Sequence, residues 1–138
     1  MHSTNYTNTF IQVADDCPVT TAQSPPLKGG AKTVACLQFE LVLQHPYQYT
    51  SDDVLFQVHA IKNNISPTGL DAARQSFFSK GQACLRCSPL VRRYGWGFHH
   101  NAEGKVAAYG VESAEYKKFS NDKSLKQVKA MRSKRKEE

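Results

Sequence analysis

The feature that most constrains this fold is a pair of aromatic and apolar runs on either side of a short turn that contains glycine. Residues 94–100 read YGWGFHH, the turn reads NAEG, and residues 105–111 read KVAAYGV. Aromatic and β-branched side chains favour strands, and two such runs joined by a short loop are typical of a β-hairpin. The sequence therefore predicts an antiparallel hairpin in the C-terminal half of the chain.

Helical periodicity marks the middle of the chain. In residues 50–65, Thr50 or Ser51 can cap an apolar stripe that recurs at helical spacing, which predicts a helix. A second helix is expected over residues 66–80, because this segment starts with Ser-Pro and ends before glycine. Residues 33–44 fit both a strand and a helix. Because that segment is long for a strand, a buried helix is favoured.

Further elements are expected near the two ends. β-branched and aromatic residues predict a strand over residues 7–14. A helix is expected around Tyr116, and another over residues 125–131, where apolar residues recur at helical spacing. Together these elements predict an α+β fold, with a small antiparallel sheet and a prominent C-terminal-half β-hairpin packed against three to four helices.

Length and composition bound the organisation of the chain. Its 138 residues, 40% hydrophobic and 22% charged, suit one globular domain and exclude a mostly disordered or collagen-like chain. We find no signal peptide and no apolar run of about 18 residues, so a cytoplasmic protein without a membrane partner is expected. The four cysteines are then expected as reduced thiols. One α+β domain is predicted over residues 1–122, followed by a basic C-terminal helix or tail over 123–138.

The net charge of +6 is concentrated in that C-terminal segment. Residues 123–138 hold seven basic and two acidic side chains, whereas residues 1–122 hold eleven and ten. Such a segment could neutralise phosphates and bind nucleic acid in a salt-dependent manner, or it could be a solvated helix with a frayed end. The residues predicted to meet an anionic partner are Lys126, Lys129, Arg132, Lys134, Arg135 and Lys136.

A second candidate site lies in and before the first run of the hairpin. Arginine beside aromatic residues could hold a phosphate or carboxylate and stack a flat ligand, but aromatic residues on a half-buried sheet are more often core. The candidate ligand-binding residues are Arg92, Arg93, Tyr94, Trp96, His99, His100 and Cys84. The Cys84/Cys87 spacing with two downstream histidines could suggest zinc. Adjacent histidines on a strand point to opposite faces, however, so no metal site is expected.

Several segments together resemble an uncharacterised family of short bacterial proteins, a domain of unknown function. These segments are residues 4–11 (TNYTNTFI), 49–56 (YTSDDVLF), 88–97 (SPLVRRYGWG), 103–105 (EGK) and 130–134 (AMRSK). The likeness runs over nearly the whole chain and implies no residue roles. The hairpin alone is also similar to the glycine-rich hairpin of TfoX- and YjbR-type modules, which are small α+β domains associated with regulation or DNA.

Two functions follow from these observations. The leading hypothesis is a non-catalytic binding or regulatory module for an anionic partner, nucleic acid among the candidates. The rival is a small-ligand-binding protein or an enzyme with a site around Arg93, Trp96, His99 and Cys84, which requires these side chains to converge on one pocket. No cofactor is expected, and the sequence leaves a homodimer open.

Overall fold

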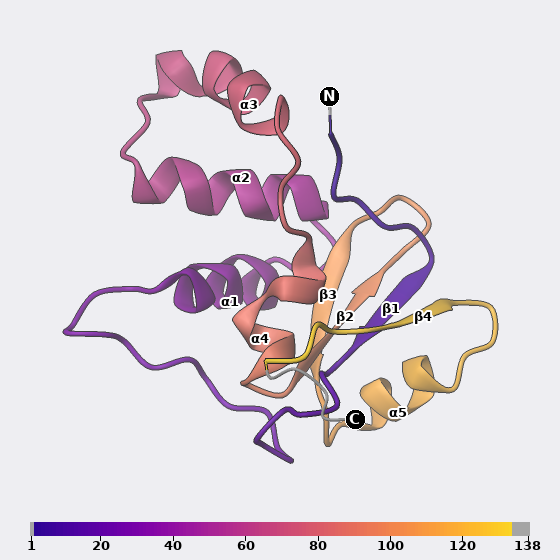
Figure 1. Ribbon diagram of the computed structural model, residues 1–138. Helices are drawn as coiled ribbons and strands as arrows, with labels where there is room; N and C mark the ends of the chain where they lie inside the picture. Colours follow the sequence, from indigo (N-terminus) through magenta and orange to yellow (C-terminus); the bar gives the residue numbers. More distant parts are fainter. Residues whose placement is uncertain (1, 134–138) are drawn as a thin grey trace.

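The computed structural model describes residues 2–133 and is organised around one four-stranded sheet in the order β3-β2-β1-β4 (Figure 1). The strands are β1 (Thr9–Gln12), β2 (Trp96–His100), β3 (Val106–Gly110) and β4 (Lys126–Lys129). The α-helices are α1 (Val34–Gln44), α2 (Ser51–Lys62), α3 (Leu70–Phe78), α4 (Pro89–Arg92) and α5 (Ala114–Ser120). Short 3₁₀ turns at Pro67–Gly69 and Leu85–Cys87 precede α3 and α4. The predicted α+β class is confirmed.

Helices cover both faces of the sheet. α1 and α4 lie against one face, α2 and α3 are stacked outward beyond α1, and α5 lies on the opposite face (Figure 1). The alternation of side chains along a strand produces the two faces. Ile11 of β1 enters the main core with Phe98 and Leu90, whereas its neighbour Phe10 meets the Tyr116 ring of α5 at 5.0 Å between centroids. The main core therefore lies between the sheet and α1 and α4.

The hairpin is confirmed, with β2 and β3 paired antiparallel from Trp96↔Gly110 to His100↔Val106. The outer edge of β3 is covered by the segment before α2. The Tyr47 N–H donates to the Val106 carbonyl at 3.0 Å, and the Val106 N–H donates to the Tyr49 carbonyl at 2.9 Å. Because the edge of β3 is paired in this way, it presents fewer free backbone groups to other chains.

The segment over residues 33–44 fitted both a strand and a helix. In the structure it forms α1, and Thr33 is the N-cap of this helix.

The helix predicted over residues 125–131 is wrong. Residues 126–129 form β4, which pairs parallel with β1 from Thr9↔Lys126 to Gln12↔Lys129, so the sheet is mixed rather than wholly antiparallel. A spacing of three along the chain also occurs by chance in a short strand, and the free edge of β1 offers backbone partners that a helix would leave unused. Val128 packs against the main core, and the rest of β4 is exposed.

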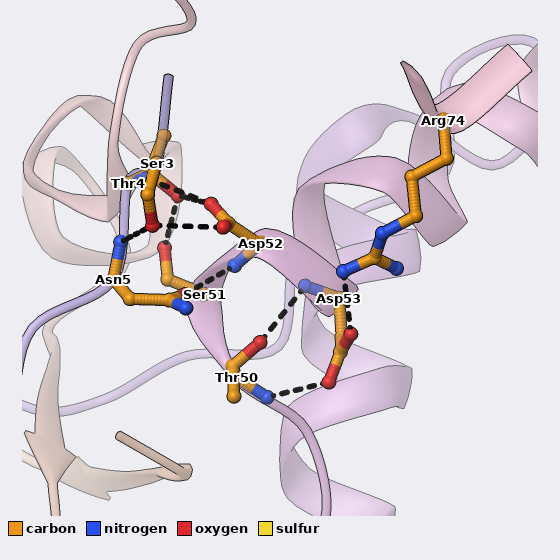
Figure 2. Close-up of polar contacts among 8 residues, drawn as sticks. All are labelled: Ser3, Thr4, Asn5, Thr50, Ser51, Asp52, Asp53 and Arg74. Atoms are coloured by element: carbon orange, nitrogen blue, oxygen red, sulfur yellow. Dashed lines mark hydrogen bonds and ion pairs between the residues drawn. The ribbon is translucent and has the colours of Figure 1, made fainter. Parts of the chain in front are cut away.

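The N-terminal segment is fastened to the start of α2 (Figure 2). The Asp52 carboxylate accepts hydrogen bonds from the Thr4 N–H and hydroxyl, both at 2.7 Å, and from the Ser3 hydroxyl at 2.8 Å. In return, the Asn5 side-chain oxygen accepts from the Asp52 N–H at 2.8 Å. Residues 2–5, which form no regular element, are thus held by side chains of a helix that is distant in sequence.

The next carboxylate, Asp53, completes the cap of α2. Its side chain accepts from the Thr50 N–H while the Thr50 hydroxyl accepts from the Asp53 N–H, which is a capping box. Arg74 of α3 donates to the same carboxylate at 2.9 Å (Figure 2). Burial alone would raise the pKa of Asp53, but the Thr50 and Arg74 contacts hold it below its ordinary value. These aspartates therefore have a structural role.

Candidate functional site

Arg93 follows directly after α4, and the anchoring of this helix decides where Arg93 lies. The Ser88 hydroxyl accepts from the Leu90 N–H at the start of α4 and donates to the Gln38 side chain of α1 at 2.5 Å. Both Ser88 and Gln38 are buried. The Arg93 N–H closes the helix on the Pro89 carbonyl at 2.8 Å, and its side chain is exposed. A short helix that is tied to α1 thus presents one arginine to solvent.

A hollow of about 370 Å³, called here the first hollow, lies beside Arg93. Its walls are residues 26–28 of the loop before α1, residues 33–35 at the start of α1, and Pro89, Arg93 and Tyr94. The volume is within the range of small-molecule sites in proteins. The first hollow therefore joins residues 26–35 with residues 89–94, which are distant from them in sequence.

A tight turn places Lys28 on the wall of the first hollow. The Lys28 N–H donates to the Ala31 carbonyl at 2.9 Å, and the Ala31 N–H donates back at 3.0 Å. Gly29 and Gly30 between them have φ of 59° and 78°, a left-handed conformation that favours glycine. The loop before α1 therefore contains a defined two-residue turn, which limits where Lys28 can point.

Two cations of the first hollow have no anionic partner in the described part of the chain. Within residues 2–133, neither the Arg93 guanidinium nor the Lys28 ammonium forms a hydrogen bond or an ion pair. The nearby Lys32 differs, because its ammonium lies 2.8 Å from the Glu40 carboxylate. Unpaired cations on the wall of a concave site are the groups that an anionic ligand needs.

Arg93 also lines a second hollow, of about 330 Å³, together with Asp16, Pro18 and Ser133. The chain reaches it after β4, where the Ser133 N–H donates to the Asp16 carboxylate at 3.1 Å. Arg93 therefore stands between two hollows, one next to the start of α1 and one next to the end of the described chain.

Part of the basic C-terminal segment is already neutralised within the fold. The Lys129 ammonium lies 3.0 Å from the Asp15 carboxylate, and the Arg132 guanidinium lies 4.0 Å from its other oxygen. Lys126 is exposed on β4. The other three residues predicted to meet an anionic partner, Lys134, Arg135 and Lys136, lie outside the described residues.

The glycines of the hairpin serve close packing. A Cβ on Gly97 would come within 2.6 Å of the Tyr116 ring, and one on Gly110 within 2.9 Å of the Ala22 Cβ. Trp96 meets the Phe39 ring of α1 at 5.4 Å, and its Nε1 donates to the Gln23 carbonyl at 2.8 Å. The tryptophan is therefore a packing residue that fixes the loop before α1.

Tyr94 stands apart from the other aromatic residues of the hairpin. Its ring is half-buried, packs against the main core and lines the first hollow. Its carbonyl accepts from the Gln23 N–H at 2.9 Å, so Gln23 of the same loop is held through both its N–H and its carbonyl. Of the aromatic candidates, Tyr94 is the one that shares a hollow with Arg93.

His99 leaves the other face of the sheet and joins a separate cluster. Its Nδ1 lies 2.8 Å from the Tyr47 hydroxyl, which lies 2.9 Å from the Tyr109 hydroxyl. The imidazole stacks on the Phe119 ring at 4.1 Å. Burial lowers the pKa of His99, and the charge of Asp122 opposes this shift. The His99 ring is therefore neutral near pH 7 and lies half-buried beneath α5.

His100 is fully buried on the face that holds the main core, and within residues 2–133 neither of its ring nitrogens has a hydrogen-bond partner. Burial and, to a smaller extent, the charge of His99 lower its pKa to about 4, and the Thr9 and Phe98 carbonyls oppose this shift without reaching hydrogen-bond geometry. Tyr6 meets the imidazole edge-on at 5.3 Å, and its hydroxyl lies 3.1 Å from the Cys84 sulfur. Burial and the contact with Cys84 raise the pKa of Tyr6 to about 12.

The seven candidate ligand residues thus occupy several environments. Trp96 and His99 leave opposite faces of β2, and Cys84 meets Tyr6 rather than either of them. Arg92 has a buried Nε without a partner among the described residues. Within residues 2–133, no three His, Cys, Asp or Glu side chains are placed to share a metal ion, and no helix has the length and apolar character to cross a membrane.

Sequence reasoning missed Lys28, the second cation of the first hollow. The Gly29-Gly30 pair was a usable signal, because two glycines favour a tight turn that would fix the residue before it. The pairing of Asp15 with the basic segment was also missed. Nothing local in the sequence indicates that contact, since it depends on β4 lying beside β1.

Comparison with known proteins identifies the family of this chain but assigns no activity to it. No curated protein and no solved structure matches the chain. The likeness of the hairpin to TfoX- and YjbR-type modules stays a prediction. Residues 1–136 match the family of unknown function DUF6157, which agrees with the resemblance of the whole chain, and the protein therefore belongs to that family.

Proposed function

We propose that this protein is a non-catalytic binding module for an anionic partner, and that its contact surface is centred on Arg93. The observation that carries the proposal is the position of this side chain. Arg93 is exposed and lines both hollows, and its guanidinium forms no hydrogen bond or ion pair within residues 2–133. A guanidinium with its donors unused can bind a phosphate or carboxylate through two parallel hydrogen bonds.

The surroundings of Arg93 support an extended partner. Lys28 adds a second cation on the first hollow, and its ammonium has no partner among the described residues. Ser133 lies at the second hollow, and the next three residues in the sequence are Lys134, Arg135 and Lys136. A polyanion bound at Arg93 would thus also meet the Lys28 cation at the first hollow, and the basic segment that follows Ser133 in the sequence is a candidate for a further contact. Nucleic acid is the polyanion with which we would test the proposal first, because its phosphates recur at regular intervals.

The test is the salt dependence of binding to a fluorescently labelled single-stranded oligonucleotide, measured by anisotropy between about 50 mM and about 200 mM salt. We expect log K to fall linearly with log salt, since each neutralised phosphate releases counterions. Arg93→Ala should weaken binding and reduce that slope by about 1. Removal of residues 134–138 should reduce the slope further while leaving β4 in place.

The matched control is Lys117→Ala. Lys117 is an exposed cation of α5, which lies on the opposite face of the sheet from α4. Its removal changes the net charge as Arg93→Ala does, but it should leave affinity and salt slope close to wild type. Binding that is absent, independent of salt, or equally weakened by both variants would contradict the proposed contact surface.

A further inference from the structure

We propose that the first hollow is a specific subsite for a phosphate monoester that is attached to a flat, mainly apolar body, as in a nucleoside 5′-monophosphate. The inference deepens the proposed function, because it uses Arg93 and names the chemistry that this surface recognises. Two sources can supply such a group: a free mononucleotide, or the phosphorylated 5′ end of a nucleic-acid strand. Both present the same phosphate and the same base.

The apolar part of the proposal rests on exposed hydrophobic side chains. Leu27 is 57% exposed and Val34 is 41% exposed, and both line the first hollow. Only four large hydrophobic residues in the described part of the chain are this exposed, so half of them lie on one concave surface. Apolar surface on a concave wall gains from a ligand body that excludes water.

The shape of the ligand body follows from the remaining walls. Tyr94, Pro26 and Pro89 contribute rings to the first hollow. Aromatic faces stack with nucleic-acid bases, whose own faces are flat and sequence-tolerant partners. The Gln23 contacts to Tyr94 and Trp96 hold the loop that forms the opposite wall. The hollow is therefore largely formed before a ligand arrives, which reduces the entropy lost on binding.

The anionic part rests on matched charge. Arg93 and Lys28 are the two cations of the first hollow, and neither has a partner within residues 2–133. A phosphate monoester carries a charge of about −1.5 to −2 near pH 7, which corresponds to these two groups better than the single charge of a carboxylate does. The guanidinium can bind two phosphate oxygens at once, and the ammonium can bind a third as a point charge. The start of α1, at residues 33–35, adds a smaller attraction through the helix dipole.

Isothermal titration of the full-length protein with three probes separates the two parts of the ligand. The probes are adenosine 5′-monophosphate, adenosine, which lacks the anion, and inorganic phosphate, which lacks the body. We expect the nucleotide to bind at least about tenfold more tightly than either, because a charge-assisted contact and burial of the base add. A nucleotide that binds no more tightly than adenosine or phosphate would overturn the proposal.

Two variants assign the parts to side chains. Arg93→Gln should weaken binding of the nucleotide about tenfold and leave adenosine unchanged. Leu27→Ser, at an exposed position that carries little of the fold, should weaken both nucleotide and adenosine. Lys117→Ala is the control and should change neither. If the nucleotide binds Arg93→Gln as tightly as wild type, the hollow does not hold the phosphate.

Oligonucleotides with a 5′-phosphate or a 5′-hydroxyl distinguish the two sources and also separate this inference from the proposed function. Tighter binding of the phosphorylated strand supports the end of a strand as the ligand. Tight binding of the free nucleotide without binding of either strand supports a small-molecule ligand and overturns the polyanion as partner. Equal binding of both strands, with no binding of the nucleotide, overturns the subsite and leaves the proposed function standing.

Discussion

Gly97 of β2 faces the Tyr116 ring of α5 so closely that a Cβ at this position would lie 2.6 Å from Cε2 of the tyrosine. The same Cβ would lie 2.8 Å from the Phe10 ring. Because both rings belong to packed aromatic pairs, neither can move aside at little cost. The absence of a side chain at residue 97 is therefore what allows α5 to approach the sheet.

Gly97→Ala should accordingly lower the free energy of unfolding by about 2 kcal/mol or more, through overpacking. Urea unfolding followed by tryptophan fluorescence measures the change. Gly81→Ala is the matched control, because a Cβ there meets nothing within 4 Å and its φ is not positive. If the two alanine variants were equally stable, α5 would not be packed against β2 as described.

His100 should make the free energy of unfolding fall as the pH is lowered from 6.5 toward 4. Its pKa is about 4 in the folded protein against an ordinary value of 6.5, so the unfolded chain binds the proton more readily. The contribution is fully present above pH 6.5 and is lost as pH falls toward 4, by about 3 kcal/mol in total. We expect His100→Leu to remove this pH dependence, so that the variant becomes more stable relative to wild type as the pH falls.

Urea unfolding of both proteins at several pH values between 7 and 4 provides the measurement. The comparison between two chains cancels the carboxylates, which also titrate in this range. An apolar side chain of similar size can replace an unpartnered buried polar group at little cost, so His100→Leu should remain folded. A constant stability difference at all pH values would contradict the burial of a neutral imidazole.

Asp52 should hold the N-terminal segment in place. Thr4 is buried, and Asp52→Ala removes the acceptor of its N–H and hydroxyl and leaves them without this partner. We expect a loss of about 2 kcal/mol in the free energy of unfolding. Hydrogen exchange at the Thr4 amide should also become faster. Asp71→Ala, an exposed aspartate in the first turn of α3, should leave that amide unchanged.

Tyr47 should stabilise the fold through its hydroxyl. Tyr47→Phe removes the hydrogen bond to His99 at 2.8 Å and the hydrogen bond to Tyr109 at 2.9 Å. We expect the free energy of unfolding, measured by thermal unfolding, to fall by about 1–2 kcal/mol. Tyr47 has a φ of 59°, in the left-handed region, and the contacts of its side chain help to compensate this backbone strain. Tyr49→Phe is the control, since its hydroxyl forms no hydrogen bond within residues 2–133. Equal losses in both variants would contradict the role of this hydroxyl.

Elements with complete local signals could be predicted from the sequence. α2 has a capping Thr50, acidic residues in its first turn and an apolar stripe, and the structure contains the capping box. The hairpin was also predictable, because its strands and turn are adjacent in the chain. For the candidate site, the sequence indicated Arg93 and Tyr94 through their residue types. It did not indicate Lys28, whose relation to Arg93 exists only after α4 docks against α1.

The sequence by itself determined the α+β class, the hairpin and the helices of the middle, because neighbouring residues supply the caps, turns and periodicity of those elements. Tertiary structure alone decided that residues 126–129 form a strand rather than a helix, since the free edge of β1 satisfies their backbone groups. It also decided which of the basic residues stay available. Lys129 and Arg132 form ion pairs with Asp15, whereas the Arg93 guanidinium has no partner among the described residues and lies between two hollows. The physical reason is that charge belongs to the residue, but its partner is set by packing between segments that are distant along the chain.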